Sequence, residues 1–220
     1  MITYNDIKHN EKIKSYIKKA DESLSALGFT EHSFAHVGLV ASRAEYILTE
    51  LGYSQHDIEL VKIASHLHDI GNIVNRKEHS QSGALMAFRI LDNMDMDAED
   101  IATIVTAIGN HDEGTGEAVS PISAALIIAD KSDVRRSRVR VEPHHPSFDI
   151  HDRVNYSVYE TDISINKEAK TVTLSLKIDT EISDVLSYFE IFMGRMLMCK
   201  KAAKTLDLIF KLIINEQVIM

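Results

Sequence analysis

The stretch Ala64–Asn72, "ASHLHDIGN", places His66, His68 and Asp69 in and directly after an apolar segment with helical periodicity. Polar side chains in such a segment cost free energy unless hydrogen bonds or a cation satisfy them. A metal ion would satisfy an imidazole and a carboxylate together. The stretch therefore predicts a metal site, provided that other segments of the chain supply further ligands.

Length and composition limit the classes of protein to consider. The chain has 220 residues, 45% of them hydrophobic, which suits one globular domain. Its net charge of −9 argues against general nucleic-acid binding. A single cysteine, Cys199, excludes an intrachain disulfide and a zinc site of several thiolates. Because the sequence has neither the apolar core of a signal peptide nor a run of 18 apolar residues, we expect no membrane span and a cytoplasmic protein.

Helical periodicity dominates the first 140 residues. Thr30, Ser54 and Ser120 are the expected N-caps, and Pro121 suits the first helical position. Glycines are expected to end several of these helices. The predicted helices cover residues 5–28, 30–52, 54–71, 78–94, 97–114 and 120–140.

The pattern changes after residue 140. Residues 141–155 contain prolines and are predicted to be a loop, whereas 161–179 alternate with period two and predict a β-hairpin with one apolar face. The remainder is predicted to be helical, with a break between Cys199 and Asp207. We therefore expect a mainly α protein, in which a helical domain over residues 1–150 carries the metal site. The hairpin and C-terminal helical extension, residues 151–220, should pack on the same domain and cover the apolar face of the hairpin.

Further candidate ligands recur at the ends of the predicted helices. Asp130 follows the apolar run "AALIIA", where a solvated surface charge is not expected. His36, His79 and His111 lie at or near other helix ends. These groups either hydrogen-bond to one another in the core or hold a cation.

The order of these residues resembles the HD-domain superfamily of metal-dependent phosphohydrolases. The matching residues are His36 in "HVGLVASRA", His68 and Asp69 in "LHDIGN", and Asp130 in "ADKSD". The resemblance covers roughly residues 30–135. It implies an all-helical bundle in which these side chains bind one metal ion.

Two more positions resemble the binuclear branch of the superfamily. His79 begins "HSQSGALMA" and His111 lies in "IGNHDE". The resemblance implies that these histidines bind a second ion and that Asp69 bridges the two; otherwise they line the cavity and contact substrate. Asn110-His111 stands where the HD-GYP phosphodiesterases have paired histidines, and their GYP signature is absent, so activity on cyclic di-GMP is not expected. The small HD hydrolases that cleave dinucleoside polyphosphates are more similar.

The resemblance implies one or two divalent ions, with Fe or Mn favoured over Ni, Co, Zn or Mg. A metal-bound hydroxide would cleave a phosphate ester or anhydride of a small phosphorylated molecule, with a nucleotide favoured. We expect Asp69, Lys131 and Asp112 to take part in catalysis, with Asp112 either orienting an imidazole or moving a proton. Substrate contacts are expected from His32, Lys131, Arg135 and Arg136, although the two arginines could equally serve a helix C-terminus.

Two other functions use the same residues. The six ligands would also suit an HD-fold di-iron oxygenase, or a non-catalytic module that binds metal or nucleotide. The methionine-rich stretch 189–199 either packs in the core or forms the seam of a homodimer.

Overall fold

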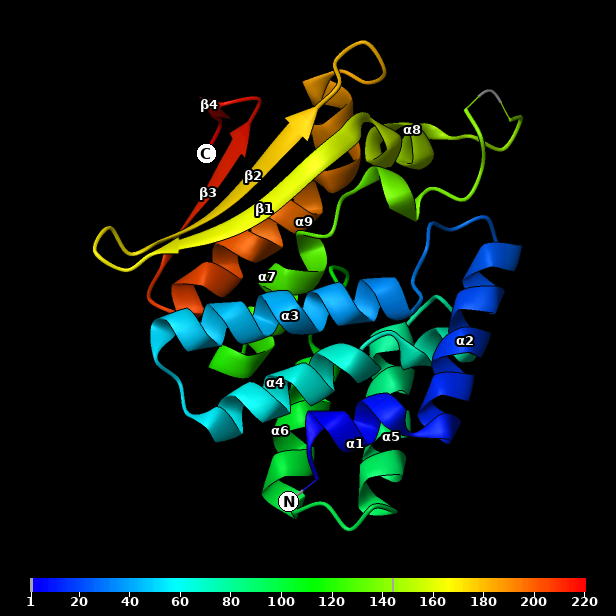
Figure 1. Ribbon diagram of the computed structural model, residues 1–220, viewed down its shortest axis with the longest axis vertical. Coiled ribbons are helices and arrows are strands. Elements are labelled where there is room, and N and C mark those ends of the chain that lie inside the picture. The colour runs from blue at the N-terminus through cyan, green and yellow to red at the C-terminus, as the bar shows by residue number, and fades with distance from the viewer. Residues whose placement is uncertain (1, 144) are drawn as a thin grey trace.

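The structure is a computed structural model that describes residues 2–143 and 145–220. In these described residues every helix except α9 precedes the strands, and α9 lies between β2 and β3 in the chain (Figure 1). The helices are α1 (Tyr4–His9), α2 (Glu11–Ala26), α3 (Phe34–Leu51), α4 (Gln55–Leu67), the 3-10 turn η1 (Ile70–Ile73), α5 (His79–Asp92), α6 (Ala98–Gly109), α7 (Pro121–Lys131), the 3-10 turn η2 (Arg136–Arg138), α8 (Ile150–Ser157) and α9 (Val185–Thr205). The strands are β1 (Val158–Asn166), β2 (Thr171–Ile178), β3 (Ile209–Ile214) and β4 (Gln217–Val218). The mainly α fold class predicted from the sequence is confirmed.

Local side-chain bonds decide where several helices begin. The first predicted helix is two helices, because Asn10 ends α1 and its side chain accepts hydrogen bonds from the first turn of α2. Ser33, not Thr30, caps α3. The predicted caps Ser54 and Ser120 are confirmed, as is Pro121 at the start of α7.

Helix α7 forms the centre of the helical part. Every residue from Ile122 to Lys131 is buried, and α7 packs against α3, α4, α6 and α9. A helix that is apolar on all sides needs this surrounding shell. The prediction that the helix continues to Arg140 is wrong: it ends at Lys131, and the chain then turns through η2. The end of α7 consequently leaves Asp130 and Lys131 in the interior.

The C-terminal region contains more strand than predicted. The hairpin is confirmed, with Ile163 opposite Leu174 and Ile165 opposite Val172. Residues 209–214 were expected to be helical but form β3, which pairs in parallel with β2. Their burial alternates along the strand, as a sheet with one covered face requires. The sheet order is β1-β2-β3-β4.

Helix α9 connects β2 to β3 and lies behind the sheet in Figure 1. It also packs against α7, so it joins the sheet to the helical part. The predicted loop over 141–155 is partly wrong, because Asp149 caps α8 through a capping box. Within the described residues, none of the helices is both long enough and apolar enough to span a bilayer.

Candidate metal centre

Four histidines direct the same ring nitrogen into one cluster. The Nδ1 atoms of His68, His79 and His111 lie 2.7, 3.0 and 2.6 Å from the backbone carbonyl oxygens of Ser65, Arg76 and Ile108. A carbonyl can only accept, so each Nδ1 carries the proton and each Nε2 offers a lone pair. The fourth, His36, donates from Nδ1 to the carboxylate of Asp133 at 2.7 Å. This tautomer is the one that metal-binding histidines adopt.

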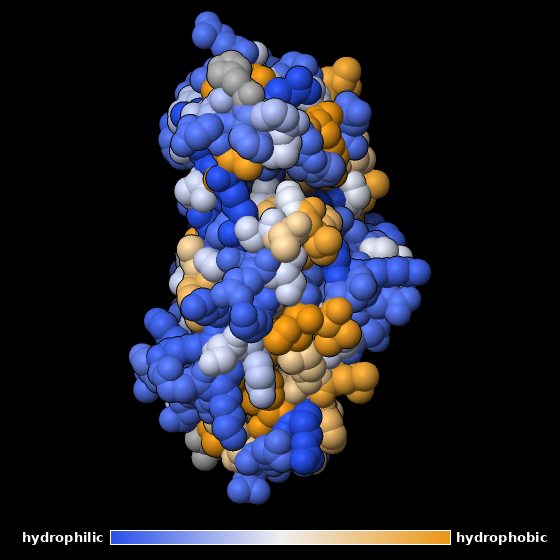
Figure 2. Space-filling model, turned by 90° about the vertical axis from the view of Figure 1, so that its right-hand side faces the viewer, coloured by the Kyte–Doolittle hydropathy of each residue, from blue (hydrophilic) through white to orange (hydrophobic). Residues whose placement is uncertain are grey.

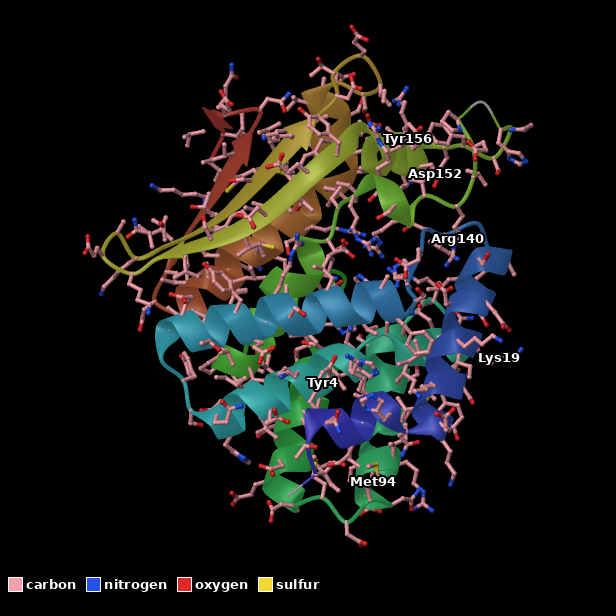
Figure 3. All side chains as sticks on the ribbon, viewed as in Figure 1. Tyr4, Lys19, Met94, Arg140, Asp152 and Tyr156 are labelled. Carbon is pink, nitrogen blue, oxygen red and sulfur yellow. The ribbon has the colours of Figure 1, made fainter. Side chains whose placement is uncertain are left out.

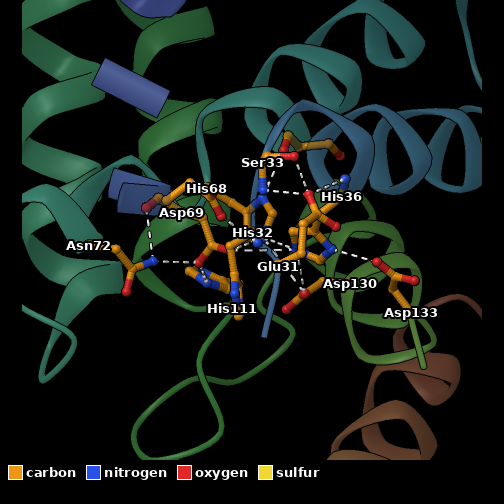
Figure 4. A network of polar contacts seen from close by, with 12 residues as sticks. Glu31, His32, Ser33, His36, His68, Asp69, Asn72, His111, Asp130 and Asp133 are labelled. Carbon is orange, nitrogen blue, oxygen red and sulfur yellow. Dashed lines mark hydrogen bonds and ion pairs between the residues drawn. The ribbon is translucent and has the colours of Figure 1, made fainter. Parts of the chain in front are cut away.

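The donor atoms of His36, His68, Asp69 and Asp130 lie close together (Figure 4). His36 Nε2 lies 3.3 Å from His68 Nε2, 3.5 Å from Asp69 Oδ2 and 3.4 Å from Asp130 Oδ1. His68 Nε2 lies 3.4 Å from the same Asp69 oxygen and 3.6 Å from that of Asp130. Distances of 3.3–3.6 Å between donor atoms are the spacing of neighbouring ligands around one ion, and His36, His68 and Asp130 form one group of potential ligands. The donor set therefore fits a metal ion.

The other carboxylate oxygen of Asp69 faces the remaining histidines. Asp69 Oδ1 lies 3.4 Å from His79 Nε2 and 3.9 Å from His111 Nε2, and these two nitrogens are 3.1 Å apart. Asp69 thus stands between two groups of donors and presents one oxygen to each. This arrangement has the form expected of a bridging carboxylate.

The turn after α4 brings Asp69 beside His79. Gly71 lies in η1 so close to α5 that an added Cβ would overlap the His79 carbonyl oxygen and the Gly83 amide nitrogen. The side chain of Asn72 donates to Asp69 Oδ1 at 2.9 Å and holds the carboxylate in place. The role of Asn72 was not predicted from the sequence.

Charge and burial make the cluster favourable for a cation. Burial raises the pKa of Asp69, but the neighbouring imidazoles of His68 and His36 outweigh it and hold that pKa well below its usual range. The pKa of Asp130 is lowered in the same way, chiefly by the Lys131 ammonium against the effect of burial. Burial lowers the pKa of His79 and His111, which keeps both imidazoles neutral.

His36 is the exception among the histidines. Burial lowers its pKa, but the carboxylates of Asp130, Asp133 and Asp69 outweigh burial and raise it to about 10. In the absence of a metal ion, a proton on His36 partly balances the two ionised carboxylates. Metal binding would release this proton.

A buried ion-pair network supports His36 from behind. Asp133, which is fully buried, accepts from His36 and also lies 2.8 Å from Arg135 Nε and 3.7 Å from Arg138 Nη1. Arg135 also pairs with Glu31 at 3.0 Å. The sequence contained a signal for Asp133, because it follows Asp130 by three residues in "ADKSD", but its role was not predicted.

The cations around the cluster differ from those expected. Arg135 is bound within the network behind His36. Arg136 donates to the Tyr156 carbonyl at 2.6 Å and lies over the Tyr156 ring. Neither arginine lines the cavity of the cluster, because α7 ends before them. That cavity is lined by His32, Asp69, Arg76, His79, His111, Asp130, Lys131, Arg138 and Arg195.

The other predicted substrate and catalytic residues lie near the cluster. His32 precedes α3, binds the Thr30 carbonyl through Nδ1 and packs edge-on against the His36 ring. Asp112 Oδ1 lies 3.9 Å from His79 Nε2. Asp112 does not orient His111, whose Nδ1 is held by Ile108. His66 points away from the cluster and packs against Tyr4.

A larger chamber adjoins the cluster. Its volume is about 390 Å³, and it shares His32, Arg76 and Arg195 with the cavity of the cluster. Its walls include apolar side chains from the segment that follows α2 and from α9, and acidic side chains from the start of α8. The remaining lining residues are Leu27, Gly28, Phe29, Thr30, Glu113, Asp149, His151, Asp152, Asn155, Ile191 and Phe192.

Polar contacts fix one wall of the chamber. Arg140 donates to the Phe29 carbonyl at 3.0 Å and pairs with Asp21, so it ties the segment before α8 to the end of α2 (Figure 3).

In Figure 2, which looks onto the side of the molecule that carries α2, hydrophobic side chains gather near the middle of a mostly hydrophilic face. The size of this cavity falls within the range of small-molecule sites.

One known protein family matches the part of the chain that contains the cluster. Residues 33–136 match the family model of the HD domain. These residues, just under half of the chain, have the sequence of an HD domain. The matched range contains His36, His68, Asp69, His79, His111 and Asp130. Together with this donor cluster, the HD domain indicates a metal-dependent hydrolase.

The chain is also similar to two known proteins. Uncharacterized protein MJ1020 of Methanocaldococcus jannaschii is 23% identical over 210 residues, which cover 86% of this chain and 79% of that protein. A crystal structure of a predicted HD superfamily hydrolase from an uncultured Thermotogales bacterium is 25% identical and has a TM-score of 0.45. That match covers 58% of this chain and 69% of the other.

Proposed function

We propose that this HD domain is a metal-dependent phosphohydrolase that acts on a small organic phosphate, with a nucleotide as the favoured class. One observation carries the proposal: imidazole nitrogens and ionised carboxylates converge at metal-ligand spacing in a cavity that arginine and lysine also line. The donors suit a divalent ion, and the cations suit a phosphate.

The donors divide into two sets on either side of Asp69. His36, His68, Asp69 and Asp130 would hold the first ion, and Asp69, His79 and His111 would contribute to a second. We favour Fe or Mn, because imidazole and carboxylate donors suit both and no thiolate lies in the cluster. When bound, such ions act as Lewis acids toward a phosphoryl oxygen and activate water for attack on phosphorus.

Side chains of the chain itself would bind and orient the substrate. Lys131 Nζ lies 2.8 Å from Asp130 Oδ2, so its ammonium is fixed beside the first set of donors. Arg76 and Arg195 stand where the cluster cavity meets the chamber and would bind phosphate oxygens. His32 lines the same junction. Asp112, about one quarter exposed and near His79, is placed to pass a proton to solvent.

The lining of the chamber favours a phosphate substrate with an organic group over inorganic phosphate. Phe29 and Phe192 offer aromatic surface, and each lies under a guanidinium, that of Arg76 and that of Arg195 respectively. An organic group in the chamber would place its phosphate at the two arginines. The chamber volume of about 390 Å³ falls in the range of small-molecule sites.

The first experiment is metal analysis of protein purified without chelator or added metal, followed by a phosphate-release screen over nucleotides, dinucleotides and sugar phosphates. About two equivalents of metal and phosphate release that stops after chelation support the proposal. About one equivalent would restrict the metal site to His36, His68, Asp69 and Asp130, and make His79 and His111 substrate contacts.

The same samples test the alternative functions. If the metal-loaded protein releases phosphate from no compound, the hydrolase proposal fails. Oxygen consumption by the reduced, iron-loaded protein would then favour an oxygenase. Nucleotide binding without turnover under several metals would favour a non-catalytic module.

A further inference from the structure

A carboxylate from the α6–α7 loop occupies the cationic side of the cluster. Glu113 Oε1 lies 3.3 Å from Lys131 Nζ and 3.1 Å from Arg195 Nε. These two cations come from α7 and α9, and both line the cavity of the cluster. One acidic oxygen therefore joins two cations that are 64 residues apart in the sequence.

Lys131 needs a second negative partner. Its side chain is only 6% exposed, and a buried ammonium is costly unless it is paired. Asp130 supplies one carboxylate, but its other oxygen belongs to the donor cluster. Glu113 supplies the second. The Glu113 side chain is 36% exposed, so rotation toward solvent would free both cations without moving the interior.

We propose that Lys131 and Arg195 form the seat of an anionic group of the substrate, and that Glu113 occupies this seat until the substrate displaces it. The proposal rests on the proposed function for the nature of the ligand, an organic phosphate. A phosphate oxygen can accept from both cations, as the Glu113 carboxylate does in the free protein.

The position of Arg195 links this seat to the chamber. Its guanidinium lies 4.5 Å from the centre of the Phe192 ring, and both side chains line the chamber. A ligand whose anionic group is on Arg195 therefore has its organic group beside Phe192. Glu113 also lines the chamber.

The loop offers a matched control. Glu117 also pairs with a lysine, at 3.8 Å from Lys201, but both side chains are more than two-thirds exposed and neither lines the cluster cavity or the chamber. Glu117→Gln removes the same charge from the same loop without touching the seat. It therefore separates a local effect of Glu113 from a general effect of net charge.

Calorimetric binding of inorganic phosphate to the full chain, with and without added metal, tests the seat. Glu113→Gln should tighten phosphate binding about tenfold, because the competing charge is removed, whereas Glu117→Gln should leave it unchanged. Arg195→Met keeps an apolar side chain on Phe192 and should weaken binding by about tenfold or more. In the Arg195→Met background, the gain from Glu113→Gln should shrink.

The outcomes separate this proposal from the hydrolase proposal. Equal phosphate affinity in Glu113→Gln and the unaltered protein would show that Glu113 does not occupy the seat in competition with phosphate, even if phosphate release is observed. Absence of phosphate binding in both proteins also overturns it. If no compound is hydrolysed but Glu113→Gln still tightens phosphate binding, the seat stands and the hydrolase proposal fails. Arg195→Lys, which keeps the charge, should recover part of the affinity lost in Arg195→Met.

Discussion

Asp133 Oδ2 accepts a hydrogen bond of 2.7 Å from His36 Nδ1, and this contact fixes the tautomer of a histidine that faces the donor cluster. Both side chains are fully buried. A carboxylate behind a ligating imidazole raises its basicity and orients its ring. Asp133 therefore belongs to the candidate metal centre although it is not one of the six donors.

Asp133→Asn should lower metal affinity about 10- to 100-fold, because it removes the charge behind His36 while keeping the shape of the side chain. Competition with a chromophoric chelator measures this affinity. Far-UV circular dichroism would show whether the variant keeps its helices. Unchanged affinity in a folded variant would contradict a positioning role for Asp133.

Because Asp69 presents one oxygen to each set of donors, we expect different results from substitution of Asp69 and of His79. Asp69→Ala should abolish binding of both ions, whereas His79→Ala should mainly weaken the second. Metal content of the purified variants checks both results. Full metal content in Asp69→Ala would show that this carboxylate is not the bridge.

Arg136 should contribute to stability and not to substrate binding. Arg136→Ala removes a hydrogen bond to the Tyr156 carbonyl and a guanidinium 4.6 Å from the Tyr156 ring centre. We expect unfolding free energy to fall by about 1–2 kcal/mol with KM unchanged. Arg76→Ala, at the junction with the chamber, should instead raise KM. Urea unfolding and steady-state kinetics on both variants distinguish the two roles.

Gly71 and Gly194 provide opposite tests of backbone packing. Gly71→Ala forces a Cβ into the backbone of α5 and should destabilise the protein by about 3 kcal/mol, with loss of metal. Gly194 lies in α9 with nothing within 4 Å of an added Cβ. Gly194→Ala should raise stability by up to about 1 kcal/mol. Thermal unfolding of the two variants should therefore shift in opposite directions.

Cys199 gives a pH-dependent prediction. Burial raises the pKa of its thiol to about 12. Alkylation by iodoacetamide should be slow in the folded protein and rise with pH up to about 12, whereas the rate in urea should level off near pH 9. Because only the unfolded thiol ionises between about pH 9 and 12, this group removes stability as pH rises through that window. Mass spectrometry of the single cysteine follows both rates; equal rates in buffer and urea would contradict burial.

The sequence predicted the fold class because the helical periodicity is long and the caps are local signals. Ser54, Ser120 and Pro121 could be identified from their neighbours alone. Strand β3 could not, because the short apolar run 209–214 fits either a helix or a strand until its partner β2 is known. Helix α8 was missed because nearby prolines suggested a loop.

The sequence predicted part of the site, as it predicted part of the fold. The six donors carry a recognisable order along the chain, and the structure brings them together. Arg195 carries no such signal: α9 places it beside Lys131 only because that helix returns the chain from β2 to β3. Arg135 and Arg136 were expected in the cavity because the helix was extended past Lys131, where the backbone instead turns away.

The chamber has an evolutionary consequence. Of its lining residues, only Arg76 and Glu113 fall within residues 33–136, and the others come from the α2–α3 connection, from α8 with its N-cap Asp149, and from α9. The donors and the walls of the chamber can therefore diverge at separate rates. Relatives that keep every donor but exchange the flanking segments would share one chemistry and accept different compounds, so an inherited HD domain does not by itself transfer a substrate.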